Sequence, residues 1–242
     1  MVVRPCSARV SRVRACICLA LALLTTEAYA QQPAKVHQIG YLISGSPAFW
    51  ANRIEALRMG LRDLGYVEGK NMALALRSAE TAERLPEAAA DLVRLNVDVI
   101  FATSSTEVEA ARGATTTIPI VFAAHADPVR LGDVASLAQP DGNITGLSML
   151  LTEIVTKELE IMTQALPHMT RIGVLLTVTA PSHRPAAQAL EVAAQQLGVQ
   201  VLTVPVHTPE DLHEAFAMLA REGVNGVLVV ASPLTRAQRT SR

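Results

Sequence analysis

Residues 97–123 read VDVIFATSSTEVEAARGATTTIPIVFA, and this stretch decides the fold. Two nearly continuous apolar runs, 97–103 and 118–123, lie on either side of a short helical segment at 105–113. Apolar runs without alternation are typical of strands that are covered on both faces, as in parallel sheets. Strands that alternate with helices form βαβ units. The stretch therefore predicts a parallel α/β sheet with helices packed on its faces.

The same alternation continues on both sides of this stretch. Further strands are predicted at 38–44, 72–77, 171–177, 199–206 and 224–231, and further helices at 48–64, 82–95, 128–137, 153–166, 185–197 and 209–221. A turn cluster (QPDGN) at 139–143 interrupts the series, and we expect a hinge near it. Four units before the turn and three after it favour two Rossmann-like, doubly wound lobes, at 31–145 and 146–242.

The first thirty residues have the three parts of a cleavable secretory signal peptide. Four arginines without an acidic residue precede an apolar run of ten at 15–24, and Ala28-Tyr29-Ala30 matches the small-x-small cleavage pattern. A membrane anchor is the alternative, but it needs about 20 apolar residues. We therefore expect export to the periplasm and cleavage after residue 30.

Composition excludes several classes of protein. The three cysteines, Cys6, Cys16 and Cys18, all lie within the predicted signal, so the mature chain would have no disulfide and no thiolate nucleophile. Without the signal, 17 basic and 21 acidic residues remain, a net charge of about −4. Nucleic-acid binding needs a basic patch or stripe, so no nucleic-acid partner is expected.

Candidate binding residues follow the strands, because ligands of open parallel sheets bind outside the carboxyl ends of the strands. They are Ser44, Ser46, Thr103, Ser104, Ser105, Thr106, His125 and Asp127 in the first lobe, and Thr177 and Thr179 in the second. The cluster at 103–106 opens a helix, whose free N–H groups suit a carboxylate or other anion. Ordinary capping by Ser and Thr is the alternative. Several hydroxyl-rich loops on one edge favour a site for a polar ligand.

The sequence gives little support to a metal site, a cofactor site or a catalytic site. Asp127 precedes Pro128 and can instead cap the next helix, and His125 has no second His or Cys at the spacing of metal ligands. Phosphate-binding glycine motifs and the nucleophile elbow G-x-S-x-G are missing from the sequence. We therefore expect no metal, no cofactor and no catalysis. An exported enzyme with Asp127 or His125 as its acid or base is an alternative, but no nucleophile–base pair supports it.

Longer stretches resemble ABC-transporter substrate-binding proteins. They include GLRDLGYVEGKN at 60–71, KELEIMTQALP at 157–167 and TTTIPIVFAAHADPVRLGDVASLAQPDGNITGLS at 115–148. The resemblance implies a type I periplasmic binding protein, in which two lobes joined by a hinge enclose an amino acid or similar small solute. It also implies delivery of that solute to an ABC permease at the inner membrane. The candidate loops would face the cleft.

Two departures from the family pattern stand out. Residues 177–185 read TVTAPSHRP where the family usually has an Asn-Pro-rich loop, which predicts a different ligand or an altered edge of the cleft. The chain closes on PLTRAQRTSR at 233–242, whereas members of the family continue for about 80–100 residues, the size of half a lobe. The second lobe is therefore expected to be incomplete, and a non-functional truncated remnant is the alternative to a working binding protein.

Overall fold

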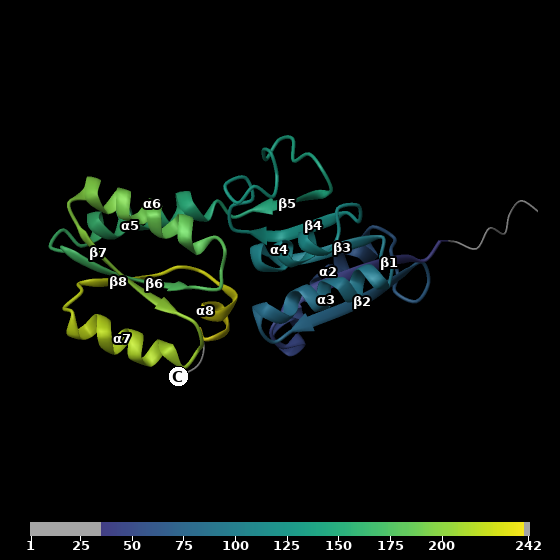
Figure 1. Ribbon diagram of the computed structural model, residues 1–242, viewed down its shortest axis with the longest axis horizontal. Helices are drawn as coiled ribbons and strands as arrows, with labels where there is room; N and C mark the ends of the chain where they lie inside the picture. The colour runs from purple at the N-terminus through teal and green to yellow at the C-terminus, as the bar shows by residue number, and fades with distance from the viewer. Residues whose placement is uncertain (1–34, 240–242) are drawn as a thin grey trace, which may run out of the picture. The chain divides into compact units, whose positions relative to one another are not determined.

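The computed structural model describes residues 35–239, and the predicted signal peptide lies outside the described residues. All the helices and strands that follow belong to one compact unit that begins at His37. They form two parallel sheets with helices on both faces of each (Figure 1). The predicted α/β class with two parallel sheets is confirmed. Within residues 35–239, no helix combines the length and the apolar character that a membrane crossing requires.

The first sheet has five strands in the order β2-β1-β3-β4-β5. Its strands are β1 (His37–Ser44), β2 (Met72–Ala79), β3 (Val99–Ser104), β4 (Ile120–His125) and β5 (Ile144–Ser148). Its helices are α2 (Pro47–Asp63), the short 3-10 helix η1 (Ala82–Arg84), α3 (Leu85–Arg94) and α4 (Ser105–Ala114). Every pair of neighbouring strands is parallel, so the carboxyl ends of all five strands lie along one edge.

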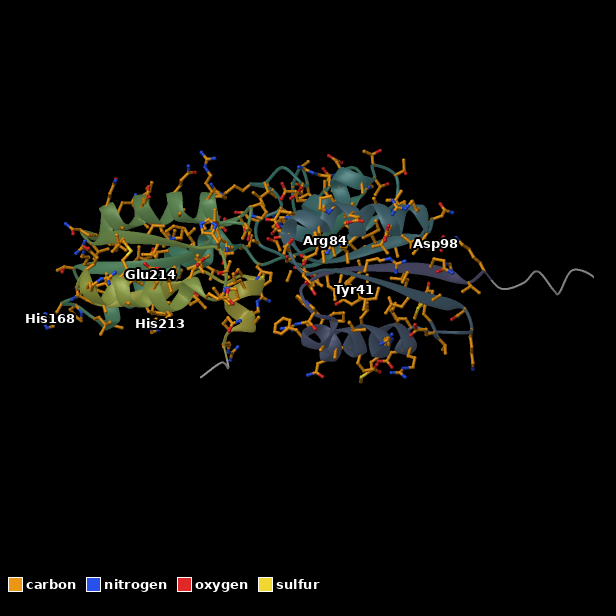
Figure 2. The ribbon with its side chains drawn as sticks, turned by 60° about the horizontal axis from the view of Figure 1, so that its bottom comes forward. Tyr41, Arg84, Asp98, His168, His213 and Glu214 are labelled. Carbon is orange, nitrogen blue, oxygen red and sulfur yellow. The ribbon has the colours of Figure 1, made fainter. Side chains whose placement is uncertain are left out.

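Alternate residues of β1 pack on opposite faces of the first sheet, as the period of two requires. Leu42 belongs to the core cluster under α3 and α4. Tyr41 and Ile43 pack instead against Trp50 and Ile54 of α2, and Figure 2 shows Tyr41 between the sheet and this helix. Burial on both faces explains why this strand has no polar residue between Ile39 and Ile43.

The second sheet has three strands in the order β7-β6-β8. Its strands are β6 (Arg171–Thr177), β7 (Gln200–Val206) and β8 (Gly226–Val229), and its helices are α5 (Leu151–Ala165), α6 (His183–Leu197), α7 (Asp211–Arg221) and α8 (Pro233–Ala237). Figure 1 shows α5 and α6 on one face of this sheet and α7 on the other. The two faces have separate cores, one around Leu159 and Leu190 and one around Leu175 and Leu219. The small second sheet is consistent with an incomplete second lobe.

The helix predicted at 128–137 is wrong, because this segment forms consecutive turns. Pro128 O accepts a hydrogen bond from Asp133 N at 2.9 Å. Gly132 lies inside this turn with φ of +73°, a left-handed conformation that ends a helical turn. The alternation of strands and helices suggested a helix here. The segment instead turns at Gly132, and the buried Asp133 pairs with His125.

Two further elements were not predicted. β5 pairs with β4 and extends the first sheet past the turn cluster at 139–143, and α8 lies in the closing segment PLTRAQRTSR, for which no helix was predicted. The predicted lobe boundary between residues 145 and 146 passes through β5. We therefore propose a boundary at residues 149–150, immediately before α5.

Candidate functional site

A cavity of about 290 Å³ lies beside the carboxyl ends of β3 and β4. Three aromatic residues and two arginines line it, together with aliphatic and hydroxyl-bearing residues. The lining residues are Tyr41, Trp50, Arg53, Ala56, Leu57, Phe101, Thr103, Ser104, Ala123, Ala124, Pro233 and Arg236. This volume corresponds to roughly ten water molecules, which is enough for a small organic solute.

The aromatic wall of the cavity is held in place by specific contacts. The rings of Tyr41 and Phe101 meet edge to face with their centroids 5.0 Å apart. Trp50 Nε1 donates a hydrogen bond to Ser44 O at 2.7 Å, which fixes the indole at the start of α2. Burial is the main cause that raises the pKa of Tyr41, so its phenol stays neutral and can donate a hydrogen bond at pH 7.

Two guanidinium groups border the same cavity. The Arg53 guanidinium lies 5.0 Å from the centroid of the Trp50 ring, within range of a cation–π interaction. Burial lowers the pKa of Arg236, and the positive charge of Arg53 lowers it further. Within residues 35–239, no carboxylate lies within ion-pair distance of either arginine.

Thr103 and Ser104 are the only two of the ten predicted binding residues that the described structure places on the lining of this cavity. Thr103 is 5% exposed, and its Oγ1 is a buried polar atom without a hydrogen-bond partner. A buried hydroxyl of this kind costs about 1–3 kcal/mol if it stays unpaired. A ligand in the cavity could supply the missing partner.

Ser44 and Ser104 are engaged by a buried carboxylate, that of Glu107. This carboxylate is fully buried in the first turn of α4, and it accepts hydrogen bonds from Ser44 N at 2.9 Å and from the hydroxyls of Ser44 and Ser104. Ser104 occupies the N-cap position of α4, but its side chain makes no capping hydrogen bond. The alternative of ordinary capping therefore does not apply to Ser104.

Ser105, His125 and Asp127 bond to one another and to neighbouring residues. Ser105 Oγ accepts a hydrogen bond from Ala126 N at 2.9 Å. His125 is fully buried and pairs through Nε2 with Asp133 Oδ2 at 2.8 Å. None of these three residues lines the cavity.

Asp127 also has protein partners. Its Oδ2 accepts from Thr152 Oγ1 at 2.8 Å and from Arg130 Nε at 3.2 Å, and its Oδ1 accepts from Arg130 N at 3.3 Å. Asp127 therefore caps a turn rather than the predicted helix. Thr152 lies in α5, so this contact connects the end of β4 to the first helix of the second half of the chain.

The remaining predicted residues lie elsewhere. Ser46 is exposed and caps α2, with its Oγ accepting from Ala48 N at 3.3 Å. Thr106 and Thr179 line a second, more open groove of about 400 Å³ beside α3 and α4. The predicted residues are thus divided among a cavity, a groove and several internal hydrogen-bond networks.

Thr177 belongs to a buried network at the carboxyl end of β6. Its N–H donates to His183 Nδ1 at 2.8 Å, and its hydroxyl bonds to Ser232 Oγ at 2.8 Å. His183 Nε2 bonds to Ala231 O at 3.1 Å. Because Nδ1 accepts, Nε2 must carry the proton and donate, so the imidazole is neutral in this network.

Lowering the pH below about 6.5, the pKa of a solvated imidazole, is expected to destabilise the fold through His183. Burial lowers the pKa of His183, and the hydrogen bond to Ala231 O opposes this only partly. The unfolded chain therefore binds a proton at a pH where the folded chain does not, so the stability present above pH 6.5 is lost as the pH falls. Tm should drop by about 2–4 °C for each kcal/mol lost.

Thermal melts between pH 5 and pH 8 would test this contribution. His183→Gln should flatten the dependence of Tm on pH, because the titrating group is gone. His168→Gln controls for removing one exposed imidazole. An equal slope in the wild type and in His183→Gln would contradict the assignment.

The aromatic residues and arginines of the cavity were not predicted from the sequence: Tyr41, Trp50, Arg53, Phe101 and Arg236. One signal was available for three of them. The chain has only four Phe, three Tyr and one Trp, and three of these eight aromatic residues border this one cavity. No group of three or more potential metal ligands exists among the residues that the structure describes.

Comparisons with known proteins agree with this fold. A family model described as ABC transporter substrate binding protein matches residues 43–237. The tyrosine-binding protein of Clostridioides difficile is 29% identical over 160 residues, which make up 66% of this chain and 46% of that protein. The chain thus spans about half the length of this curated relative.

Solved structures show the same architecture. A conserved domain protein from Vibrio cholerae has 29% sequence identity and a TM-score of 0.72, over 80% of this chain and 64% of that one. An ABC domain from Streptococcus pneumoniae in complex with L-Trp has 19% identity and a TM-score of 0.72, over 84% of this chain and 68% of that one. The second likeness concerns the fold alone. The predicted type I periplasmic binding fold is confirmed.

Proposed function

The chain belongs to the family of ABC transporter substrate binding proteins, and we propose that it is the solute-binding component of an ABC importer. It binds a small polar solute, an amino acid or a similar carboxylate, between its two α/β lobes. It then delivers the solute to an ABC permease in the inner membrane. The proposed location is the periplasm, which the predicted signal peptide at 1–30 would supply.

One observation carries this proposal: the cavity at the carboxyl edge of the first sheet contains a buried hydroxyl, Thr103 Oγ1, that lacks a partner. Ligand sites in proteins are mostly apolar concavities with a few well-placed polar groups. The cavity fits that description, because Thr103 and two arginines line it together with three aromatic residues. Its volume of about 290 Å³ suits a solute of amino-acid size.

Removing the hydroxyl of Thr103 should weaken binding without changing the shape of the cavity. Thr103→Val replaces the hydroxyl with a methyl group, and we expect the Kd to rise about five- to tenfold, the value of one hydrogen bond to a neutral group. Isothermal titration of the chain with the common amino acids and small organic acids would measure this. Thr145→Val, at an exposed position of β5, is the matched control and should keep the wild-type Kd.

The same titration addresses the alternative, a non-functional remnant. One observation on the second sheet favours this alternative: β8 lies at an edge of this small sheet, with Val229 exposed. A cooperative thermal transition together with saturable binding would contradict it. A chain that melts cooperatively but binds no solute in a broad screen would contradict the transport proposal.

An exported enzyme is the less favoured alternative. Its best acid or base would be His125 or Asp127, and both are buried and hydrogen-bonded to other residues of the chain. Neither lines the cavity. The geometry therefore supports binding over catalysis.

A further inference from the structure

The charged side chains among the described lining residues of the cavity are all positive. Among its described residues are two arginines and no aspartate or glutamate. Arg53 approaches from the first half of α2, and Arg236 approaches from α8. Burial is the main cause that lowers the pKa of Arg236, and the positive charge of Arg53 lowers it further. A bound anion would relieve this repulsion.

The two guanidinium groups are available to such an anion. No described carboxylate is within ion-pair distance of them, although Arg53 stacks on Trp50 at 5.0 Å. Guanidinium groups bind carboxylates in a bidentate way, and they can stack on an aromatic ring at the same time. The Arg53–Trp50 pair is therefore compatible with binding a carboxylate.

The remaining wall of the cavity is apolar. Tyr41, Trp50, Leu57 and Phe101 line it, and the rings of Tyr41 and Phe101 are already in edge-to-face contact. An aromatic ring would gain both burial and ring–ring contacts here. The apolar wall therefore favours an anion with an aromatic body over a small, fully hydrated one such as acetate.

Among the described residues of the lining, a positively charged amino group would find no acidic side chain as its counter-charge. Glu107 is the acidic residue whose charge acts on Arg236, but it does not line the cavity. Its carboxylate already accepts three hydrogen bonds from Ser44 and Ser104. An ammonium beside two guanidinium groups would be repelled, because like charges in a partly buried site oppose one another.

We propose that this cavity selects an aromatic carboxylate without an α-amino group, such as an arylpropionate or arylacetate. The carboxylate pairs with Arg53 and Arg236, the ring lies against Trp50 and Phe101, and the Thr103 hydroxyl completes the polar contacts. This assignment rests on the proposed function and narrows its solute class from amino acids and similar carboxylates to deaminated aromatic acids.

Three isosteric pairs test the assignment. They are 3-phenylpropionate with phenylalanine, 3-(4-hydroxyphenyl)propionate with tyrosine, and indole-3-propionate with tryptophan; the members of each pair differ chiefly in the α-amino group. In isothermal titration of the whole chain, at least one deaminated acid should bind at least tenfold more tightly than its amino acid. Arg53→Gln and Arg236→Gln should each weaken that binding about 10- to 100-fold, as expected for a hydrogen bond to a charged group.

Arg62→Gln is the matched control, because Arg62 lies on the same helix but is exposed and pairs with Glu55. It should leave the Kd unchanged, and thermal melts of all three variants would establish that each one folds. Amino acids that bind as tightly as their deaminated partners would overturn the inference and leave the proposed function intact. The inference would also be overturned if Arg53→Gln and Arg236→Gln bound the deaminated acid with the wild-type Kd. A folded chain that binds neither set would overturn the proposed function as well.

Discussion

Gly146→Ala is expected to lower the free energy of unfolding by about 2–5 kcal/mol, from steric overlap and backbone strain combined. Gly146 lies in β5 opposite Phe122 of β4, next to an irregularity in the pairing of the two strands. A Cβ atom at this position would overlap the Phe122 carbonyl oxygen and approach Cδ2 of the Phe122 ring to 2.6 Å. Backbone atoms cannot move aside as a flexible side chain can, so β5 would have to shift away from the sheet.

Urea denaturation of the wild type and the variant would measure this loss. Gly60→Ala is the matched control, since Gly60 lies inside α2 and a Cβ there meets nothing within 4 Å. The free energy of unfolding of that variant should rise by about 0.5–1 kcal/mol, because alanine loses less conformational entropy than glycine in a helix. An unchanged urea midpoint for Gly146→Ala would mean that β5 does not pack against Phe122 as described.

The strength of a local pattern determined how much of the fold the sequence could predict. β3 and β4 were predictable, because all their residues are buried or half-buried and therefore read as nearly continuous apolar runs. β5 reads ITGLS and buries only Ile144. Its place in the sheet depends on pairing with β4 at a glycine, and no periodicity within five residues reveals such a long-range contact.

The sequence predicted only those residues of the candidate site that a single rule identifies. Thr103 follows from the rule that ligands bind beyond the carboxyl ends of parallel strands. Arg236 does not, because α8 reaches the cavity only through the folding of the second sheet. The Ser44 hydroxyl looked free in the sequence, yet it bonds to Glu107, a residue whose burial no local pattern indicated.

The buried carboxylate of Glu107 connects the loops after β1 and β3 through its hydrogen bonds to Ser44 and Ser104. Its removal should lower the free energy of unfolding. Glu107→Ala would leave three donors without an acceptor: Ser44 N and the hydroxyls of Ser44 and Ser104. Each unpaired buried donor costs about 1–3 kcal/mol, although hydroxyls can rotate toward other partners. The negative charge in the first turn of α4 also interacts favourably with the positive end of the helix. We expect a total loss of about 3–5 kcal/mol on this basis.

Two further variants make this result specific. Glu109→Ala removes an exposed acidic side chain of the same helix and should change stability by no more than about 0.5 kcal/mol. Glu107→Gln keeps one acceptor oxygen but turns an NH₂ group toward donors, so its loss should fall between those of the two alanine variants. If Glu107→Gln were as stable as the wild type in urea, the carboxylate would not be the acceptor that joins the loops after β1 and β3. Ser44 O also accepts the hydrogen bond that holds Trp50, so removing the Glu107 carboxylate should disturb the aromatic wall of the cavity. A change in indole fluorescence would report this disturbance.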